Sequence, residues 1–181
     1  MNFVSAYLSQ RRLSKSFEAV KNNDIGSLVN INPNPSQKFT YNACGVDLYI
    51  SLLDRAMCSH SYTCAKWLLD NGAYPYPTDS FAESLYMLER RKIDQLIVEN
   101  KNFNTGESEG LNNPPVSYTQ SPELTLALAF YRAQKLTPPN SSVLEVSRWT
   151  NLTPAVTQWL ERQLPAYEAS LLPTVSQLFV R

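Results

Sequence analysis

The sequence repeats itself once in its middle, and this repeat constrains the fold more than any other feature. Aligning Ser51 with Ser80 superposes SLLDRAMCSHSYTCAKWLLDN on SFAESLYMLERRKIDQLIVEN. In each copy an acid follows the serine by three residues, Asp54 in the first and Glu83 in the second. This spacing is typical of a capping box, in which a hydroxyl and an acid satisfy the free amides at a helix start. Both serines are therefore predicted to begin helices.

Each copy of the repeat is predicted to form two short helices. The first helix ends near His60 in one copy and near Glu89 in the other, and the second carries an apolar stripe at helical spacing. The rows Trp67–Leu68–Leu69 and Leu96–Ile97–Val98 are expected to be equivalent and to stack in one interior. Neither pair could bury its apolar side alone, so the prediction is an all-α fold of stacked helical hairpins.

The segment AKWLLDNGAYP, residues 65–75, resembles the second helix and following turn of an ankyrin repeat. Gly72 would supply the left-handed conformation that ends this helix, and Pro75 would prevent its continuation. The family's usual Thr-Pro-Leu-His is Ser51-Leu52-Leu53-Asp54 here, and Tyr74 replaces the usual Asp of the turn. The resemblance implies a binding scaffold and no particular partner.

A further unit precedes this repeat. Residues 17–30, FEAVKNNDIGSLVN, are similar to the capping repeat that opens ankyrin arrays, with Ala19 in the small position that Ala56 holds in the next unit. Asp24 would start its second helix, and residues 30–40, with two prolines, are expected to form a loop. The resemblance thus implies an ankyrin-like array over residues 1–103, with a cap at 16–43 and repeats at 51–76 and 80–103.

The remaining chain is predicted to be a linker followed by a helical extension. Residues 104–121 are polar and turn-rich, which is typical of a linker or long surface loop. In the extension, residues 122–181, Ser121 would cap a helix with Pro122 at its first position. Three helices are expected to pack on the array and cover its open apolar face. They are placed after Ser121, over 142–150 and from Thr153-Pro154 to before Pro165, with a short helix or turn at 175–180.

Residues 143–164 also resemble a helix-turn-helix unit. A DNA-reading role would use exposed side chains near the start of its second helix. The candidates for this role are Arg148, Thr157, Gln158 and Arg162. Residues 115–181 carry only five basic side chains against four acidic ones, too little charge to neutralise several phosphates. The alternative is a packed helical hairpin that extends the array.

Charge and cysteine usage exclude several classes of protein. Sixteen basic and sixteen acidic residues give a net charge of zero, which disfavours a general nucleic-acid or membrane-surface binder. No stretch approaches the roughly 20 apolar residues that span a bilayer. The three cysteines, Cys44, Cys58 and Cys64, form no CxxC pair and suit a reducing compartment. The prediction is a cytoplasmic protein, in the producing cell or in a host cell that receives it.

No motif for catalysis is evident. His60 is the only histidine, and its spacing to Cys58 and Cys64 matches no zinc arrangement. The chain has no phosphate loop, GxGxxG, GxSxG or HExxH. We therefore expect no metal, no cofactor and no enzymatic activity. A nucleophile formed by Cys58 and His60 is the enzyme hypothesis that stays open.

The predicted function is binding, and the ten tyrosines are the sequence feature that bears on it most. Tyrosine is common at binding hot spots because it offers a large amphipathic surface at low entropic cost. Tyr74 and Tyr76 could instead pack on their own hairpin. Partner contacts are expected on the concave face and turns, at Asp47, Tyr49, Arg55, His60, Tyr74 and Tyr76.

The partner is expected to be another protein, which the chain would bind and inhibit or sequester. Its short, divergent repeats look like those of bacterial or viral effector-type ankyrin proteins. The second hypothesis is a helix-turn-helix regulator with an ankyrin-like portion.

Overall fold

The chain is mostly helical, as the sequence predicts. The computed structural model describes residues 3–43, 45–78, 80–99, 119, 121–137 and 152–172. Within these ranges lie seven helices and a two-stranded sheet, and the sheet was not predicted. The elements are α1 (Phe3–Lys21), α2 (Ile25–Ile31), β1 (Lys38–Ala43), β2 (Val46–Ser51), α3 (Leu52–Cys58), α4 (Tyr62–Asp70), α5 (Ser80–Glu99), α7 (Pro122–Leu136) and α8 (Pro154–Leu171).

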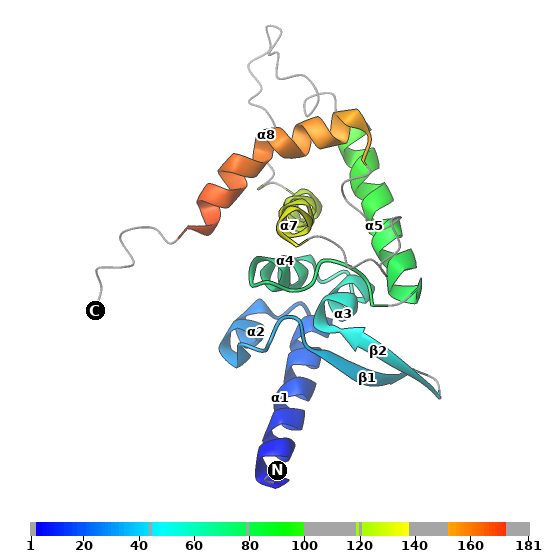
Figure 1. Cartoon of the computed structure of the whole chain (residues 1–181), viewed down its shortest axis with the longest axis vertical. Coiled ribbons are helices and arrows are strands. Elements are labelled where there is room, and N and C mark those ends of the chain that lie inside the picture. Colours follow the sequence, from blue (N-terminus) through cyan, green and yellow to red (C-terminus); the bar gives the residue numbers. More distant parts are fainter. Residues whose placement is uncertain are drawn as a thin grey trace, which may run out of the picture.

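Two rows of helices make up the body of the molecule (Figure 1). In one row α1 packs on α3, and α3 packs on α5. In the other row α2 packs on α4, and α4 packs on α7. Helix α8 lies across the end of the stack and packs on both α5 and α7. Because one cluster of buried apolar residues runs from α1 to α8, the N-terminal stack and the C-terminal helices share an interior.

Capping residues explain where several helices begin. The Asp24 carboxylate accepts a hydrogen bond from a backbone N–H at the start of α2. At α3 the capping box is complete: Ser51 Oγ accepts from the Asp54 N–H at 3.0 Å, and the Asp54 carboxylate accepts from the Ser51 N–H at 2.8 Å. Ser121 caps α7, with Pro122 at its first position. These local predictions are confirmed.

A β-hairpin occupies part of the segment expected to be a loop. β1 pairs antiparallel with β2, from Lys38 opposite Ser51 to Ala43 opposite Val46. Apolar and polar residues alternate along both strands, so the register places the two kinds on opposite faces. The loop predicted over residues 30–40 is therefore wrong at 30–31, where α2 ends, and at 38–40, where the alternation that favours a strand begins.

The predicted break within residues 80–103 is also wrong. α5 runs without interruption from Ser80 to Glu99. No Gly or Pro occurs in this stretch, and most of its residues are good helix formers, so nothing local stops the helix at Glu89. The second copy of the repeat is thus one long helix and not a pair.

The two apolar rows that the repeat was expected to align are not equivalent. In α4, Leu68 and Leu69 are buried, whereas in α5 Ile97 is buried and Leu96 and Val98 are 43% and 49% exposed. The helix that packs along α4 is α7, from beyond the predicted linker. Tertiary packing therefore pairs α4 with a segment that is distant in the sequence.

The C-terminal predictions are confirmed in part. α8 begins after Thr153 with Pro154 at its first position, as predicted, and Val156, Trp159 and Leu160 are buried along it. It does not end before Pro165 but continues to Leu171, and its ribbon bends across the top of the stack (Figure 1). The expected helix at 142–150, the turn at 175–180 and nearly all of the 104–121 linker lie outside the described residues.

Two buried carboxylates hold α5 against the α3–α4 pair. Asp54 is fully buried and accepts hydrogen bonds from the Thr78 and Tyr86 hydroxyls at 2.6 and 3.0 Å, in addition to those from Ser51. Burial, followed by the charge of Asp54, raises the pKa of Tyr86 well above its ordinary value. The Tyr86 hydroxyl therefore stays protonated and keeps donating to Asp54.

Glu89 makes the second joint, between α5 and the α3–α4 turn. Its side chain is 1% exposed and accepts from the Tyr62 hydroxyl and the Lys92 ammonium, both at 2.7 Å, while His60 Nδ1 lies 3.0 Å away. Burial alone would raise the pKa of Glu89. The hydrogen bonds from Lys92 and Tyr62 and the charges of Lys92 and His60 outweigh burial and lower it.

Candidate partner-binding surface

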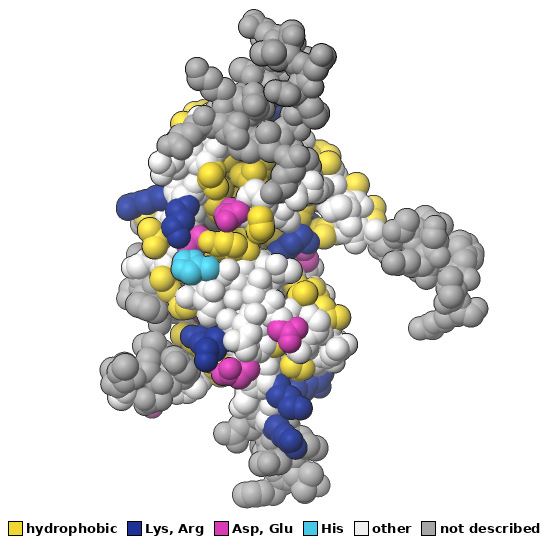
Figure 2. Space-filling model, turned by 180° about the vertical axis from the view of Figure 1, so that it is seen from behind, with side chains coloured by type: hydrophobic (Ala, Val, Ile, Leu, Met, Phe, Trp, Pro, Cys, Tyr) yellow, Lys and Arg dark blue, Asp and Glu magenta, His cyan; other side chains and the backbone are white. Residues whose placement is uncertain are grey.

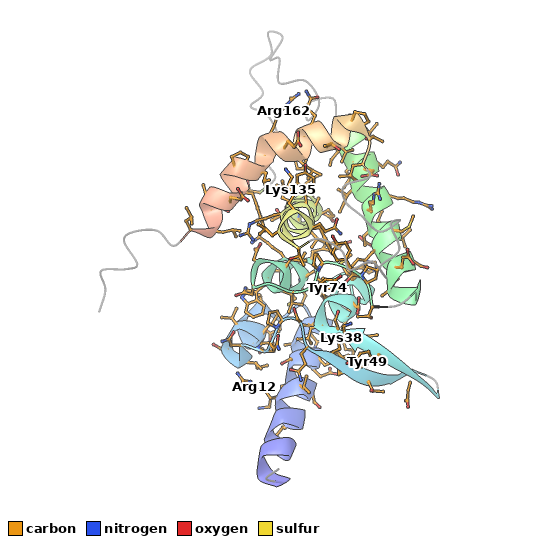
Figure 3. All side chains as sticks on the ribbon, in the orientation of Figure 1. Arg12, Lys38, Tyr49, Tyr74, Lys135 and Arg162 are labelled. Carbon is orange, nitrogen blue, oxygen red and sulfur yellow. The ribbon has the colours of Figure 1, made fainter. Side chains whose placement is uncertain are left out.

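The hairpin turns a polar face to solvent and an apolar face to the body. On the apolar face, the ring centroid of Phe39 lies 5.0 Å from that of Phe17 in α1, and Ile50 is buried. On the polar face Tyr49 is 59% exposed, with the Lys38 ammonium 5.8 Å from its ring centroid. Figure 3 shows both residues on the hairpin. The alternation of the strands thus presents an aromatic ring and a cation together.

The turn after α4 adjoins this polar face. Gly72 adopts φ +89°, and the Ala73 N–H donates to the Leu68 carbonyl, so the helix ends in the left-handed turn that the sequence predicts. The Ser36 hydroxyl donates to the Gly72 carbonyl at 3.0 Å, which ties the segment before β1 to this turn. Tyr74, on the turn, is half-buried.

Tyr74 and Tyr76 differ although their rings lie 5.0 Å apart. Tyr76 is 2% exposed, and its hydroxyl donates to the Thr137 carbonyl at the end of α7. The structure therefore places Tyr76 in the packing between this turn and α7, and not on the exposed surface. We define the hairpin face as Ser36, Lys38, Asp47, Tyr49 and Tyr74.

A small recess borders the hairpin face. The recess between β1 and the turn, which Lys38, Tyr74 and Thr78 help to line, has a volume of about 10 Å³. A void of that size holds at most about one water molecule. This shape suits a protein surface better than a small-molecule ligand, because small ligands bind in concave pockets of several hundred Å³.

Two other predicted contacts lie elsewhere. The Arg55 guanidinium is 4.5 Å from the centroid of the Phe17 ring, where it helps α3 pack on α1. His60 adopts φ +51° in the turn between α3 and α4 and bonds Glu89, as described above. The single histidine, cyan in Figure 2, is exposed near Lys and Arg side chains. Of the six predicted residues, Asp47 and Tyr49 share one face of the hairpin, and Tyr74 lines the recess beside Lys38 on that face.

Lys38 and Ser36 were missed from the sequence. The signal that could have found Lys38 is the two-residue alternation from Lys38 to Ser51, which places residues 38, 40, 47 and 49 on one face. Ser36 gives no such signal, because its role depends on a turn 36 residues away in the chain.

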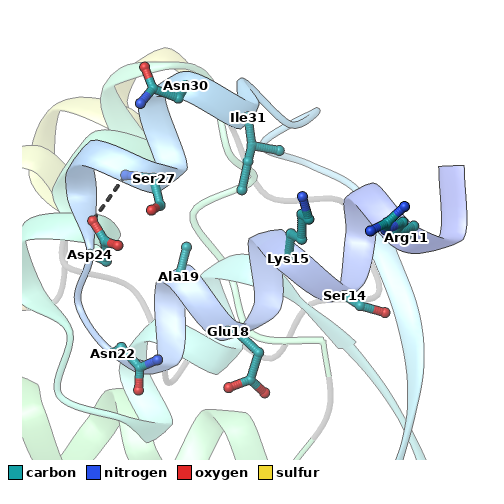
Figure 4. A pocket seen from close by; sticks show the side chains of 10 residues that line it. All are labelled: Arg11, Ser14, Lys15, Glu18, Ala19, Asn22, Asp24, Ser27, Asn30 and Ile31. Carbon is teal, nitrogen blue, oxygen red and sulfur yellow. Dashed lines mark hydrogen bonds between the residues drawn. The ribbon is translucent and has the colours of Figure 1, made fainter. Parts of the chain in front are cut away.

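A polar groove lies at the opposite end of the stack from α8. It has a volume of about 610 Å³ and runs between α1 and α2 (Figure 4). Arg11 and Lys15 line it together with Glu18 and Asp24, and hydrogen bonds from Ser27 lower the pKa of Asp24. Charges of both signs and a polar lining suit a solvated end of a stack.

The alternative DNA-reading residues are only partly described. Gln158 and Arg162 are exposed on α8, Thr157 is half-buried, and Arg148 lies outside the described residues (Figure 3). The first helix of the resembled helix-turn-helix also lies outside them. The structure therefore does not test the DNA-binding hypothesis, which stays a prediction from the sequence.

The surroundings of Cys64 disfavour a nucleophile, and Cys44 lies outside the described residues. Burial, aided by the charge of Asp24, raises the pKa of Cys64 to about 11, and Cys58 is half-buried. A raised pKa lowers the thiolate fraction, which is the opposite of what a nucleophile needs. Across the described residues no three His, Cys, Asp or Glu side chains gather as a metal site. In the same parts of the chain, no helix is both long and apolar enough to cross a bilayer.

Comparison with known proteins does not extend these assignments: no protein family, no curated protein and no solved structure matches the chain.

Proposed function

We propose that this protein is an ankyrin-like stack of three helical hairpins that binds a partner protein through the hairpin face. The observation that carries the proposal is the pair of helix rows, α1–α3–α5 and α2–α4–α7, with a connection projecting between successive units. The hairpin β1–β2 links the first unit to the second, and the turn bearing Tyr74 links the second to the third.

In this proposal the third unit is α5 with α7. α5 continues the row of α1 and α3, and α7 continues the row of α2 and α4. α8 then covers the end of the stack with Trp159 and Leu160, as a terminal cap must in a repeat protein. The resemblance of residues 65–75 to an ankyrin turn agrees with this assignment, since Gly72 and Ala73 make that turn.

The composition of the hairpin face supports a protein as the ligand. Tyr49 and Tyr74 supply large amphipathic contact areas, and Lys38 and Asp47 supply charges of both signs. Aromatic anchors with a polar surround are typical of protein interfaces. By occupying the partner's surface, the protein would sequester or inhibit it. We place this binding in the cytoplasm, where the thiols of Cys58 and Cys64, neither of which is in a disulfide, would stay reduced.

The experiment compares capture of partner proteins by matched variants. The full chain is used as bait in an extract of its source organism, or of a host cell that it enters, beside Tyr49→Ala/Tyr74→Ala and Gln158→Ala. We expect the wild type and Gln158→Ala to retain the same partner, and the double variant to lose at least about tenfold in its recovery. Equal recovery by all three baits would contradict the proposal.

A further inference from the structure

We infer that the outer edge of β1 binds an extended segment of the partner as a third strand. The inference rests on the proposed function and names the form in which the partner is recognised. It follows from the direction of the backbone groups in the hairpin, which the strand register fixes.

The register shows which residues point their N–H and C=O groups outward. Ala43 pairs with Val46, so the connection between the strands has only two residues. In such a hairpin the pair that flanks the connection exchanges both of its hydrogen bonds. Successive pairs alternate from there, so 42↔47, 40↔49 and 38↔51 are the pairs whose backbone groups point away from the partner strand.

A hydrogen bond outside the sheet supports this assignment. The Ser51 N–H donates to the Asp54 carboxylate at 2.8 Å, so it points away from β1 as the alternation requires. This bond uses the Ser51 N–H, and α3 begins directly after Ser51. The outer edge of β2 is therefore not open to another strand at this end. The β1 edge keeps three outward positions in sequence, at Lys38, Thr40 and Asn42.

Within the described residues, β1 has no paired strand at its outer edge. Among the described elements, only β2 runs alongside it. The hairpin projects from the helical body, as Figure 1 shows, and Lys38 and Thr40 are exposed. A row of outward backbone donors and acceptors is a template for another strand unless it is covered, and many domains recognise extended peptides this way.

The side chains of the edge define the chemistry of the segment. A strand added to β1 would place alternate residues beside Lys38 and Thr40 on the exposed face. Lys38 favours an acidic residue as its neighbour, and Thr40 favours a β-branched one. The intervening residues would lie beside Phe39, which contacts Phe17, so they should be apolar. The occupant is thus an extended segment of about five residues with an acidic residue and alternating apolar ones.

The test uses random peptides of about twelve residues displayed on phage, selected against the full chain, and the most enriched peptide in synthetic form. Its affinity is measured for the wild type, Thr40→Pro and Thr40→Val. Proline removes the outward N–H without removing a bond between β1 and β2, whereas valine keeps the N–H and the branched shape. Circular dichroism and urea unfolding establish that both variants fold.

We expect selected peptides to carry the acidic and alternating pattern, Thr40→Pro to weaken binding at least about tenfold, and Thr40→Val to bind within about twofold of wild type. Hydrogen exchange at the Thr40 amide should slow when the peptide binds. Equal binding by Thr40→Pro, or no enrichment from the library, would overturn strand addition. In either case a partner lost with Tyr49→Ala/Tyr74→Ala in the capture experiment would leave the proposed function standing.

Discussion

The joint around α5 and the hairpin face use polar residues in opposite ways. At the joint, Asp54 and Glu89 are buried, and each carboxylate accepts several hydrogen bonds, including one from a tyrosine on another helix. On the hairpin face, Tyr49 is largely exposed and its ring has only the Lys38 ammonium near it among the contacts described above. The joint stabilises the stack, whereas the hairpin face has surface available for a partner.

This contrast predicts that substitutions at the joint lower the stability of the fold, whereas substitutions on the hairpin face weaken binding of the partner. A buried carboxylate is costly to disturb, because its donors lose their partner without regaining water. An exposed aromatic side chain contributes little to folding and much to an interface. The substitutions below test this separation in order of decreasing effect on stability.

Asp54→Ala should have the largest effect. It leaves the hydroxyls of Thr78 and Tyr86 without their acceptor and removes half of the capping box at α3. We expect a loss of about 3–4 kcal/mol in the free energy of unfolding, measured with urea. The control Glu83→Ala, at the half-buried acid in the first turn of α5, should cost about 1 kcal/mol or less. Similar losses in the two variants would contradict a structural role for the Asp54 network.

Glu89→Gln should have the next largest effect, about 2 kcal/mol at neutral pH, because the amide accepts fewer and weaker hydrogen bonds than the carboxylate. The pKa of Glu89 is lower in the folded chain than its ordinary value of 4.5. Its contribution to stability is therefore present above that value and is lost as the pH falls through the lower, folded-state pKa.

The pH dependence gives this prediction a separate readout. Urea unfolding from neutral pH down through pH 4 should show that the difference between wild type and Glu89→Gln shrinks as the pH falls. A difference that stays constant over this range would mean that the charge of Glu89 does not stabilise the joint.

Tyr167→Phe should have a smaller effect, about 1–2 kcal/mol. The Tyr167 hydroxyl on α8 donates to the Asp70 carboxylate of α4 at 2.7 Å, and Lys66 donates to the same carboxylate. Removing the hydroxyl leaves Asp70 one partner, so the charge stays compensated. A variant as stable as wild type would show that the hydrogen bond from Tyr167 to Asp70 does not help to hold α8 on α4.

The sequence predicted what depends on neighbouring residues. The capping roles of Asp24, Ser51 and Ser121 were found because each involves a backbone N–H within three residues. The start of α8 was found because proline favours the first position of a helix. The Gly72 turn was found because a left-handed residue favours glycine.

What the sequence could not predict depends on distant contacts. That α7 packs along α4 is a tertiary contact across the segment after α5, and no local pattern encodes it. The roles of Glu89 and Tyr76 are of this kind, since their partners lie on other elements. The continuous α5 was predictable from composition, but the alignment with the preceding repeat favoured a break.

Tyr49→Ala should have the smallest effect on stability, within about 0.5 kcal/mol of wild type, because the side chain is 59% exposed. The same substitution should weaken partner binding by more than any of the changes at the joint. A loss of stability comparable with that of Glu89→Gln would place Tyr49 in the structural part of the molecule.

The most direct test of the account is site-specific photo-crosslinking in the cell that contains the partner. A benzophenone side chain replaces Tyr49 on the hairpin face or, as a control, Gln158 on the exposed side of α8. We expect light-dependent crosslinking of one protein from position 49 and little of that protein from position 158. Crosslinking from position 158 alone, or equal yields from both positions, would contradict binding through the hairpin face.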